Sequence, residues 1–416
     1  MDLHRPSDTP RCAGLDVSKT DAKVCVRLSS PDRKPVQEIT TWSSMSRDIL
    51  RLRDYLTEEQ VTCVVMEATG DYWKPFYYVL EDAPFEVMLV NAHDAKNLPG
   101  RKTDVSDAAW LAQLAAHGLL RASFVPPEPI RRLRDLTRTR TAITRERSRE
   151  IQRLEKVLED AGIKLSVVVS DITGVSARRM LRALATGQRD PDVLAEMSVK
   201  LLRRKIPALT QALQGRFTEH HAFLVTLHLD FIDQHTIQID TLTARIEEVM
   251  APFQAARDLL VSIPGISTTT ADVIIAETGA DMTQFPTPGH LASWAGVCPG
   301  HHQSAGRTKN AKTRPGNRHL KGALGAAALS IANHRGTFLN AKYGHLMRHR
   351  GKPKAIVAIE HSLLTIIWNM LTDNTSYREP GPDYHQRSHP ERTRNQAIRQ
   401  LQQLGFTVTL TPNEAA

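Results

Sequence analysis

Short apolar runs alternate with amphipathic segments over the first 124 residues, and this pattern restricts the N-terminal part of the chain to an α/β arrangement. Residues 11–28 are expected to form a hairpin, because apolar residues alternate on both sides of a polar turn. The later runs VTCVVM and FEVMLVN are apolar and contain several valines, which is typical of buried strands. Helices are expected at 46–57, at 70–82 and from residue 104 onward. We therefore predict an α/β domain over residues 1–124.

The sequence changes character at VPPEP, residues 125–129, and the rest of the chain has a helical pattern. Residues 130–160 carry nine arginines and few apolar positions, so one face of this helix is expected to be wet or bound to phosphate. From Val225 to Val249, apolar residues and two histidines step by three and four, which is a heptad seam. Such a seam suits a long antiparallel helical hairpin or an intermolecular coiled coil. The predicted regions are a helical, coiled-coil middle at 128–250, a mostly helical C-terminal domain at 255–372 and a polar tail at 373–416.

The charge of the chain is concentrated in one segment. The net charge is +9, yet no acidic residue occurs between Asp281 and Glu360. Residues 301–354 alone contain twelve lysines and arginines. A solvated basic face normally carries some acids as well, so this segment predicts a polyanionic partner, and nucleic acid is the natural one.

Four carboxylates stand at the ends of expected elements. Asp16 lies near the end of the first strand, Glu67 ends the strand VTCVVM, and Asp104 and Asp107 open a later helix. Such aspartates often only cap a helix or favour its positive end. Together, however, two strand-end acids and a helical i, i+3 pair can converge at one sheet edge and supply the oxygen ligands that Mg²⁺ prefers. Phosphoryl transfer on nucleic acids uses such clusters.

A second phosphate site is suggested by the stretch LLVSIPGISTTTADVIIAETG, where two helices meet at a Pro-Gly turn. Backbone N–H groups at this hairpin, around Gly265, together with the next helix N-terminus would suit a phosphate. The alternative is a tight helical hairpin without a ligand.

Several motifs now carry a resemblance to a known family. They are GLDVSK around Asp16, MEATGDYW around Glu67 and GRKTDVSDAAWLAQL around Asp104 and Asp107. They look like the DEDD transposases of bacterial insertion sequences, which are similar to the Piv-type DNA invertases. The resemblance continues, in the same order, through IPGI and HLASWAGVCPGHHQSAGRTKNAKTRPGNRHLKGAL. It implies a RuvC-like ribonuclease H fold for the N-terminal domain, Mg²⁺ as cofactor of the four carboxylates, and transposase or recombinase activity on DNA.

The resemblance further implies a serine nucleophile, which the motif places at Ser304 in QSAGRTK. This serine, in the same or another subunit, would attack the DNA phosphate, and a phosphoserine link would preserve the bond energy for rejoining. Members of the family resemble RNA-guided recombinases, so donor DNA, target DNA and a structured bridge RNA are the implied partners. The residues expected to contact nucleic acid are Lys102, Arg131, Arg134, Arg138, Arg145, Gly265, Arg307, Lys309, Lys312, Arg314, Arg318 and Lys321.

An alternative function is a metal-dependent, structure-specific endonuclease that uses water as nucleophile. A synaptic reaction needs at least two protomers, so a dimer or tetramer on DNA is expected. The sequence has no apolar signal core at its start and no run of roughly 18 to 20 apolar residues, so we expect a cytoplasmic bacterial protein that joins the nucleoid when it acts. The four cysteines show no CxxC pairing and are expected to be reduced, mostly buried thiols.

Overall fold

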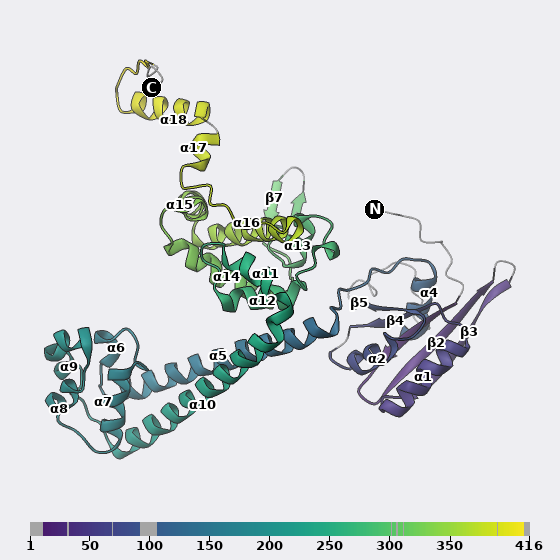
Figure 1. Cartoon of the computed structure of the whole chain (residues 1–416), viewed down its shortest axis with the longest axis horizontal. Helices are drawn as coiled ribbons and strands as arrows, with labels where there is room; N and C mark the ends of the chain where they lie inside the picture. Colours follow the sequence, from purple (N-terminus) through teal and green to yellow (C-terminus); the bar gives the residue numbers. More distant parts are fainter. Residues whose placement is uncertain are drawn as a thin grey trace. The chain divides into compact units, whose positions relative to one another are not determined.

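The computed structural model describes residues 11–30, 33–68, 70–91, 106–300, 302–304, 307–310, 312–388 and 390–411. The chain divides into two compact units, and the boundary in the sequence lies between Val125 and Pro126. The first unit is built on a mixed sheet with helices, and the second is mostly helical (Figure 1). This agrees with the predicted combination of an α/β part and a helical part.

The first unit contains a five-stranded sheet in the order β3-β2-β1-β4-β5. β1 is antiparallel to β2, and β2 to β3, whereas β1 and β5 each pair parallel with β4. The strand bounds are β1 Arg11–Val17, β2 Asp21–Ser30, β3 Arg33–Ser43, β4 Cys63–Glu67 and β5 Glu86–Val90. The predicted hairpin and both predicted buried strands are therefore confirmed.

The two faces of this sheet are covered by different helices (Figure 1). α1 (Ser46–Glu58) and α2 (Trp73–Leu80) bury Leu52 and Phe76 with alternate residues of the central strands, such as Leu15 and Met66. The opposite face of the sheet is covered by α4 (Asp107–Ala116), an alanine-rich helix. Because successive strand residues point to opposite faces, Gly14 and Asp16 of β1 face α4.

Strand β3 was not predicted from the sequence. It lies at the edge of the sheet, and its apolar residues Val36 and Ile39 are 62% and 52% exposed. An edge strand with so little buried surface has no clear alternation of apolar and polar residues, which is the signal on which the prediction depends.

The second unit is organised around a pair of long helices, α5 (Glu128–Asp160) and α10 (Glu219–Met250). They are antiparallel, since Asp160 bonds His221 at 3.0 Å and Glu150 bonds His228 at 2.8 Å. The heptad seam of α10 is buried or half-buried along its length. Of the two predicted uses of the seam, the structure therefore has the antiparallel helical pair within one chain.

Two groups of helices pack at opposite ends of the α5/α10 pair (Figure 1). At one end are short helices, as predicted for 164–216: α6 Leu165–Val168, α7 Val175–Ala185, α8 Pro191–Glu196, η1 Lys200–Lys205 and α9 Ile206–Ala212. At the other end lie η2 Ala251–Phe253, α11 Gln254–Val261, α12 Thr268–Thr278, η3 Met282–Gln284, α13 Pro288–Trp294, α14 Arg318–Asn333, α15 Phe338–Arg350 and α16 Lys352–Asp373, with the hairpin β6 His302–Ser304 and β7 Arg307–Asn310. The tail contains α17 Tyr384–Ser388 and α18 Pro390–Gln403.

One described helix, α16, is long and apolar enough to cross a membrane by length and composition alone. Its residues Ile359, Leu363 and Ile367 are fully buried in the helical core, which is how the core helix of a globular protein passes the same test. Cys12, Cys25 and Cys63 are buried and Cys298 is half-buried, in agreement with the expectation of mostly buried cysteines.

Candidate active site and nucleic-acid interface

The register of the central strands brings two of the predicted carboxylates together. β1 and β4 run parallel with Leu15 opposite Met66, so the next residues, Asp16 and Glu67, are neighbours at the carboxyl ends of adjacent strands. Both follow residues that face α1 and α2, so both face the α4 side of the sheet. Asp16 and Glu67 are half-buried.

The third carboxylate reaches the same region through a close contact between α4 and β1. A Cβ atom on Gly14 would lie 2.1 Å from the carbonyl oxygen of Ala108 and 2.6 Å from the amide nitrogen of Ala112. Only glycine permits this approach of helix to strand. Asp107 stands one residue before Ala108, at the start of the helix that covers the face to which Asp16 points.

The N-cap of α4 is Ser106, whose hydroxyl accepts a hydrogen bond from the backbone N–H of Ala109 at 3.3 Å. Asp107 follows it as the first residue of the helix. The helix cap is therefore supplied by the serine, and capping does not account for Asp107. Its charge still favours the positive end of the helix dipole.

The donor set suits a hard cation, since carboxylate oxygens on one sheet face are the ligands that Mg²⁺ takes in proteins. Asp104, the fourth predicted ligand, and Lys102 lie outside the described residues. Within the described part of the chain, no three His, Cys, Asp or Glu side chains are grouped closely enough to hold an ion. Asp16 and Glu67 thus lie at neighbouring strand ends on the α4 side of the sheet and Asp107 opens α4, but the described residues do not bring these three acids into one ion-binding group.

In the second unit, the arginine-rich face of α5 packs against acids of α12. Arg138 donates through Nε and Nη2 to the two carboxylate oxygens of Glu277, both at 2.8 Å. Arg134 donates to the backbone oxygens of Ala276 and Glu277 at 3.1 and 2.8 Å. Glu277 is fully buried, and Asn317 donates to it as well at 2.7 Å. Burial alone would raise the pKa of Glu277, but the hydrogen bonds from Arg138 and Asn317 and the nearby charges outweigh it and hold that pKa below its ordinary value.

A second buried acid, Asp272, holds the same helices together one and a half turns earlier. It accepts hydrogen bonds from Arg140 of α5 and Arg257 of α11, each at 2.9 Å. Arg257 also forms a paired contact with Glu247 of α10 at 2.5 and 2.6 Å. The arginines of α5 were expected to face water or phosphate, and the structure adds a third kind of partner, buried carboxylates of the same unit.

Asp272 and Glu277 were not singled out in the sequence. Their signal is present in the printed stretch TTTADVIIAET, because two acids interrupt a helix whose positions 270–278 are all buried. A buried carboxylate needs a cationic partner, so these acids indicate arginine partners elsewhere in the chain.

Ser304 ends β6 and pairs with Arg307, the first residue of β7, across the hairpin. The hairpin is closed at its base by a bridge between Pro299 and Thr313. The side chains of residues 301–311, including Ser304, Arg307 and Lys309, are outside the described set. The described backbone thus places the predicted nucleophile next to the tip of a two-stranded hairpin.

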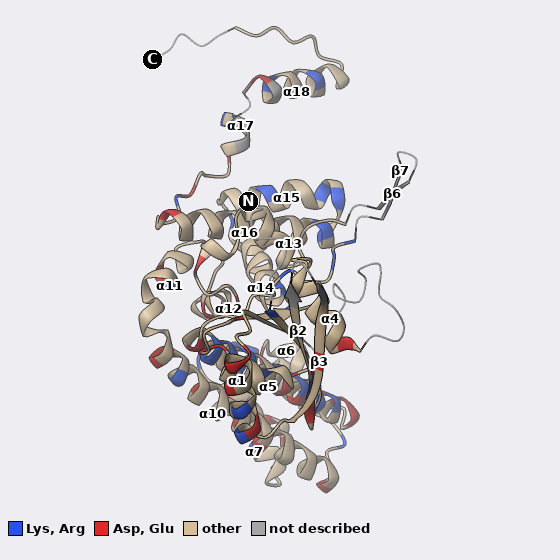
Figure 2. Ribbon diagram, turned by 90° about the vertical axis from the view of Figure 1, so that its right-hand side faces the viewer, with Lys and Arg blue, Asp and Glu red and all other residues tan. Residues whose placement is uncertain are grey.

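The basic residues after this hairpin differ in their surroundings. Lys312, Arg314 and Arg318 are exposed. Lys321 instead donates to the carbonyl oxygen of Gly296 and to the hydroxyl of Thr313, both at 3.0 Å, so its ammonium group holds the base of the hairpin. Further exposed cations, Arg348 and Arg350, lie at the end of α15. The ribbon of α15 carries blue segments in Figure 2.

Of the three remaining predicted contacts among the described residues, Gly265 and Arg131 have structural partners of their own and Arg145 does not. Gly265 adopts a φ of +94°, and a Cβ there would lie 2.5 Å from the side chain of Ile331. This close packing against α14 explains why residue 265 is a glycine, and no bound phosphate is needed to explain it. Arg131 donates to the carbonyl oxygen of Pro126 at 3.2 Å. For the guanidinium of Arg145, no hydrogen bond or ion pair is found among the described residues.

An α/β unit with acids at adjacent strand ends, followed by a helical unit with exposed cations, is typical of enzymes that act on nucleic acids. Two family models match the chain, a transposase model of the DEDD type from IS110 elements over residues 13–163 and the IS116/IS110/IS902 transposase family over residues 257–343. The chain belongs to the IS110 family of transposases. The predicted resemblance to DEDD transposases is confirmed.

Curated relatives agree with this assignment. A transposase for insertion sequence element IS1111A from Coxiella burnetii is 25% identical over 77% of this chain and 80% of its own length. An insertion element IS110 protein of Streptomyces coelicolor is 34% identical over 30% of this chain, which spans 31% of that protein. The pilin gene-inverting protein of Moraxella bovis is 32% identical over 29% of this chain and 38% of its own length.

Proposed function

We propose that the chain cuts and rejoins the DNA strands of an insertion sequence, with Asp16, Glu67, Asp104 and Asp107 as ligands of Mg²⁺ and Ser304 as nucleophile. One observation carries this proposal more than any other. Asp16 and Glu67 are register neighbours at the ends of parallel strands, and Asp107 is the first residue of α4, the helix that packs closely on Gly14 of the same face of the sheet.

The order of the strands supports a RuvC-like ribonuclease H fold for the first unit. Three antiparallel strands, β1 to β3, continue into the parallel strands β4 and β5 in the order β3-β2-β1-β4-β5. In such a sheet, the carboxyl ends of β1 and β4 lie at one edge, where Asp16 and Glu67 stand.

A divalent ion held by these carboxylates would supply charge neutralisation at the phosphate and at the attacking and leaving oxygens. The protein's own contribution is to fix the positions of the ligands. β1 and β4 present Asp16 and Glu67 from a sheet whose residues Leu15 and Met66 are fully buried. Such packing holds the strand ends, and with them the carboxylates, in one place.

The proposed chemical step exchanges one phosphate ester for another. The Oγ of Ser304 forms a bond to phosphorus, the bond from phosphorus to one bridging oxygen of the strand breaks, and the strand is left with a free hydroxyl end. The serine proton passes to a base and a proton reaches the leaving oxygen, so charge is conserved. Attack by the hydroxyl end of a second strand reverses the step, restores a phosphodiester and releases the serine without ATP.

Exposed cations support nucleic-acid binding by the second unit. Lys312, Arg314 and Arg318 are exposed beside the hairpin that carries Ser304, and Arg307 and Lys309 belong to its second strand. Because Arg134 and Arg138 are held by α12, they are proposed to position α5 more than to contact phosphate. Donor and target DNA, a bridge RNA and assembly of a dimer or tetramer on DNA remain part of the proposal.

The second candidate is a metal-dependent, structure-specific endonuclease. The same carboxylates would then serve a water nucleophile, and Ser304 would not react. This candidate is supported by the location of Asp16, Glu67 and Asp107, which all belong to the first unit. That unit could hydrolyse a strand without the hairpin of the second unit.

The two candidates differ in whether DNA becomes covalently attached. We would incubate the purified chain with Mg²⁺, RNA transcribed from the sequence flanking its gene, and labelled DNA carrying the element's junction. A denaturing gel would then detect a protein–DNA adduct. Ser304→Ala and Asp104→Ala test the proposed groups, and Ser293→Ala, an exposed serine of α13, and Asp54→Asn, an exposed acid of α1, are matched controls.

An adduct that is lost in Ser304→Ala and Asp104→Ala but kept in both controls would support the serine mechanism. Cleavage without an adduct that survives Ser304→Ala and is lost in Asp104→Ala would establish the endonuclease instead. An adduct that persists in Ser304→Ala would assign the nucleophile to another residue.

A further inference from the structure

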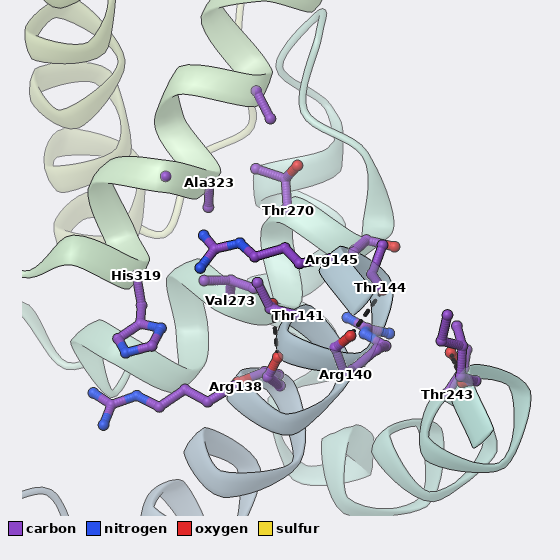
Figure 3. A pocket seen from close by; sticks show the side chains of 15 residues that line it. Arg138, Arg140, Thr141, Thr144, Arg145, Thr243, Thr270, Val273, His319 and Ala323 are labelled. Atoms are coloured by element: carbon purple, nitrogen blue, oxygen red, sulfur yellow. Dashed lines mark hydrogen bonds between the residues drawn. The ribbon is translucent and has the colours of Figure 1, made fainter. Parts of the chain in front are cut away.

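A cavity of about 450 Å³ lies between α5, α10, α12 and α14, and none of its described lining residues belongs to the hairpin that carries Ser304. Figure 3 shows Arg145 crossing it toward α14, with Thr270 on one side and Val273 and His319 on the other. This volume falls within the range of roughly 300 to 1,000 Å³ that is usual for sites of small organic ligands. The cavity is not used by the proposed cleavage step.

The side chains that line the cavity leave one cation without a partner. No acid lines it. Arg138 and Arg140, which do, are neutralised by Glu277 and Asp272 behind them. The guanidinium of Arg145 has neither an ion pair nor a hydrogen bond within the described part of the chain, and its side chain is exposed at the mouth. The cavity therefore presents an excess of positive charge, which favours an anionic ligand.

The histidine at the edge of the cavity adds no second charge. Burial lowers the pKa of His319, and the charges of Arg138, Arg318 and Arg145 lower it further against the opposing effect of Glu277. The Nε2 of His319 accepts a hydrogen bond from the Nε of Arg318 at 3.4 Å, which requires a neutral ring and leaves Nδ1 as its donor.

The walls of the cavity are largely apolar, although several threonines line them. The hydroxyls of Thr137, Thr141, Thr144 and Thr243 donate to backbone carbonyl oxygens one turn earlier in their helices. Because the hydroxyl protons are already donated to the backbone, these threonines offer a ligand only methyl groups and acceptor oxygens. With Ile239, Val273, Ala323 and Ala326 they form a surface suited to the face of a flat ring that carries amino groups at its edge.

An anchor for an anion at the mouth and an apolar, acceptor-bearing wall behind it match the two halves of a nucleotide. We propose that this cavity receives one unstacked nucleotide of the nucleic acid that the chain acts on, with the base against the apolar wall and the phosphate at Arg145. This inference rests on the proposed function. Room for the base depends on Gly322, where a Cβ would lie 3.8 Å from the Arg145 guanidinium and a larger side chain would fill the space.

The test measures binding of labelled single-stranded DNA and of RNA of the same sequence to the full chain, by fluorescence anisotropy. Arg145→Ala removes the anchor, and Arg149→Ala removes an equal charge one turn further along α5, at an exposed residue outside the cavity. Gly322→Leu fills the cavity, and Gly344→Leu places the same side chain in open space on α15. Oligonucleotides carrying photoreactive thio-bases then locate the contact by cross-linking and mass spectrometry.

We expect Arg145→Ala and Gly322→Leu each to weaken binding roughly tenfold more than their controls, and cross-links to form with peptides of α12 or α14. The strand type that shows this loss, RNA or DNA, identifies the source of the nucleotide. Equal losses for Arg145→Ala and Arg149→Ala, with no cross-link to α12 or α14, would overturn the inference while the proposed function stands. If the unaltered chain binds neither strand, both fail. The arginine pair and the cross-links decide the matter even if Gly322→Leu does not fold.

Discussion

Arg138 on α5 donates two hydrogen bonds of 2.8 Å to Glu277 on α12, and Glu277 is completely buried. Asn317, the N-cap of α14, completes the arrangement by donating to the same carboxylate. Three helices of the second unit are thus joined at one acid. Paired, planar contacts of this kind are geometrically specific, so the pair sets the relative position of these helices.

Loss of the Glu277 charge should destabilise the second unit strongly. Glu277→Gln leaves Arg138 and Arg134 facing a neutral group, and breaking a buried pair in this way costs about 3 kcal/mol of unfolding free energy. Urea unfolding monitored by circular dichroism would measure it. Glu248→Gln, at an exposed acid of α10, is the control and should change the free energy of unfolding by less than about 0.5 kcal/mol. Equal values for the two variants would show that the pair does not stabilise the unit.

The pH dependence of the same contact follows from the sign of its pKa shift. The pKa of Glu277 is lowered in the folded chain, so its ionised form contributes stability above the unfolded pKa, and this is lost as pH falls through the folded pKa. We expect acid unfolding of the unaltered chain to be steeper than that of Glu277→Gln. Identical slopes would contradict the assignment.

Glu360 on α16 should behave in the opposite way. It is 4% exposed, its Oε2 has no hydrogen-bond partner in the described structure, and burial raises its pKa, partly opposed by the charge of Lys321. The stability that protonated Glu360 contributes is fully present below the unfolded pKa and is lost as pH rises through the folded pKa. Glu360→Gln should therefore raise the unfolding free energy by about 1 kcal/mol at a pH of about 8, with little effect at a pH of about 4. A loss of stability at the higher pH would refute this.

Gly14 is expected to control both stability and activity of the first unit. In Gly14→Ala the new Cβ meets backbone atoms of Ala108 and Ala112, which cannot move without the whole of α4. Overpacking of this kind costs about 3 kcal/mol, and the shift of α4 displaces Asp107. Thermal unfolding and the DNA cleavage assay should both show a loss. Gly344→Ala, where a Cβ meets nothing within 4 Å, is the control.

Gly265→Ala separates packing from phosphate binding at the helical hairpin. The positive φ and the contact with Ile331 predict a loss of about 2 kcal/mol in unfolding free energy. Folded Gly265→Ala protein should bind DNA as tightly as the unaltered chain. A large loss of affinity without a loss of stability would restore the phosphate-binding interpretation.

Much of the first unit could be predicted because its signals are local. Alternation around residues 18–21 and the apolar runs before Glu67 and Asn91 specify β1, β2, β4 and β5. Asp16 and Glu67 stand out for the same reason, since each follows a strand whose end is visible in the sequence. Asp107 was found with them, but the reason for its position, the absence of a side chain at Gly14, is a contact between distant segments.

The second unit was less predictable because its key contacts are far apart in the chain. Arg138 and Glu277 are separated by 139 positions, and nothing near Arg138 announces a buried acid. The arginines of α5 therefore looked like a surface for phosphate. The heptad seam of α10 did not reveal which helix packs against it, because that helix is also distant in the sequence. The contacts of His221 and His228 with α5 identify α5 as the partner.

The most direct test of a shared carboxylate site is the binding of Mn²⁺, a paramagnetic substitute for Mg²⁺, measured by electron paramagnetic resonance without nucleic acid. The variants are Asp16→Asn, Glu67→Gln and Asp107→Asn, with Asp54→Asn as the control. We expect each of the three to lose affinity by roughly tenfold or more, since every ligand contributes to one site, and the control to bind like the unaltered chain. Unchanged Mn²⁺ binding in Glu67→Gln, with the fold intact, would contradict a site shared by the ends of β1, β4 and α4.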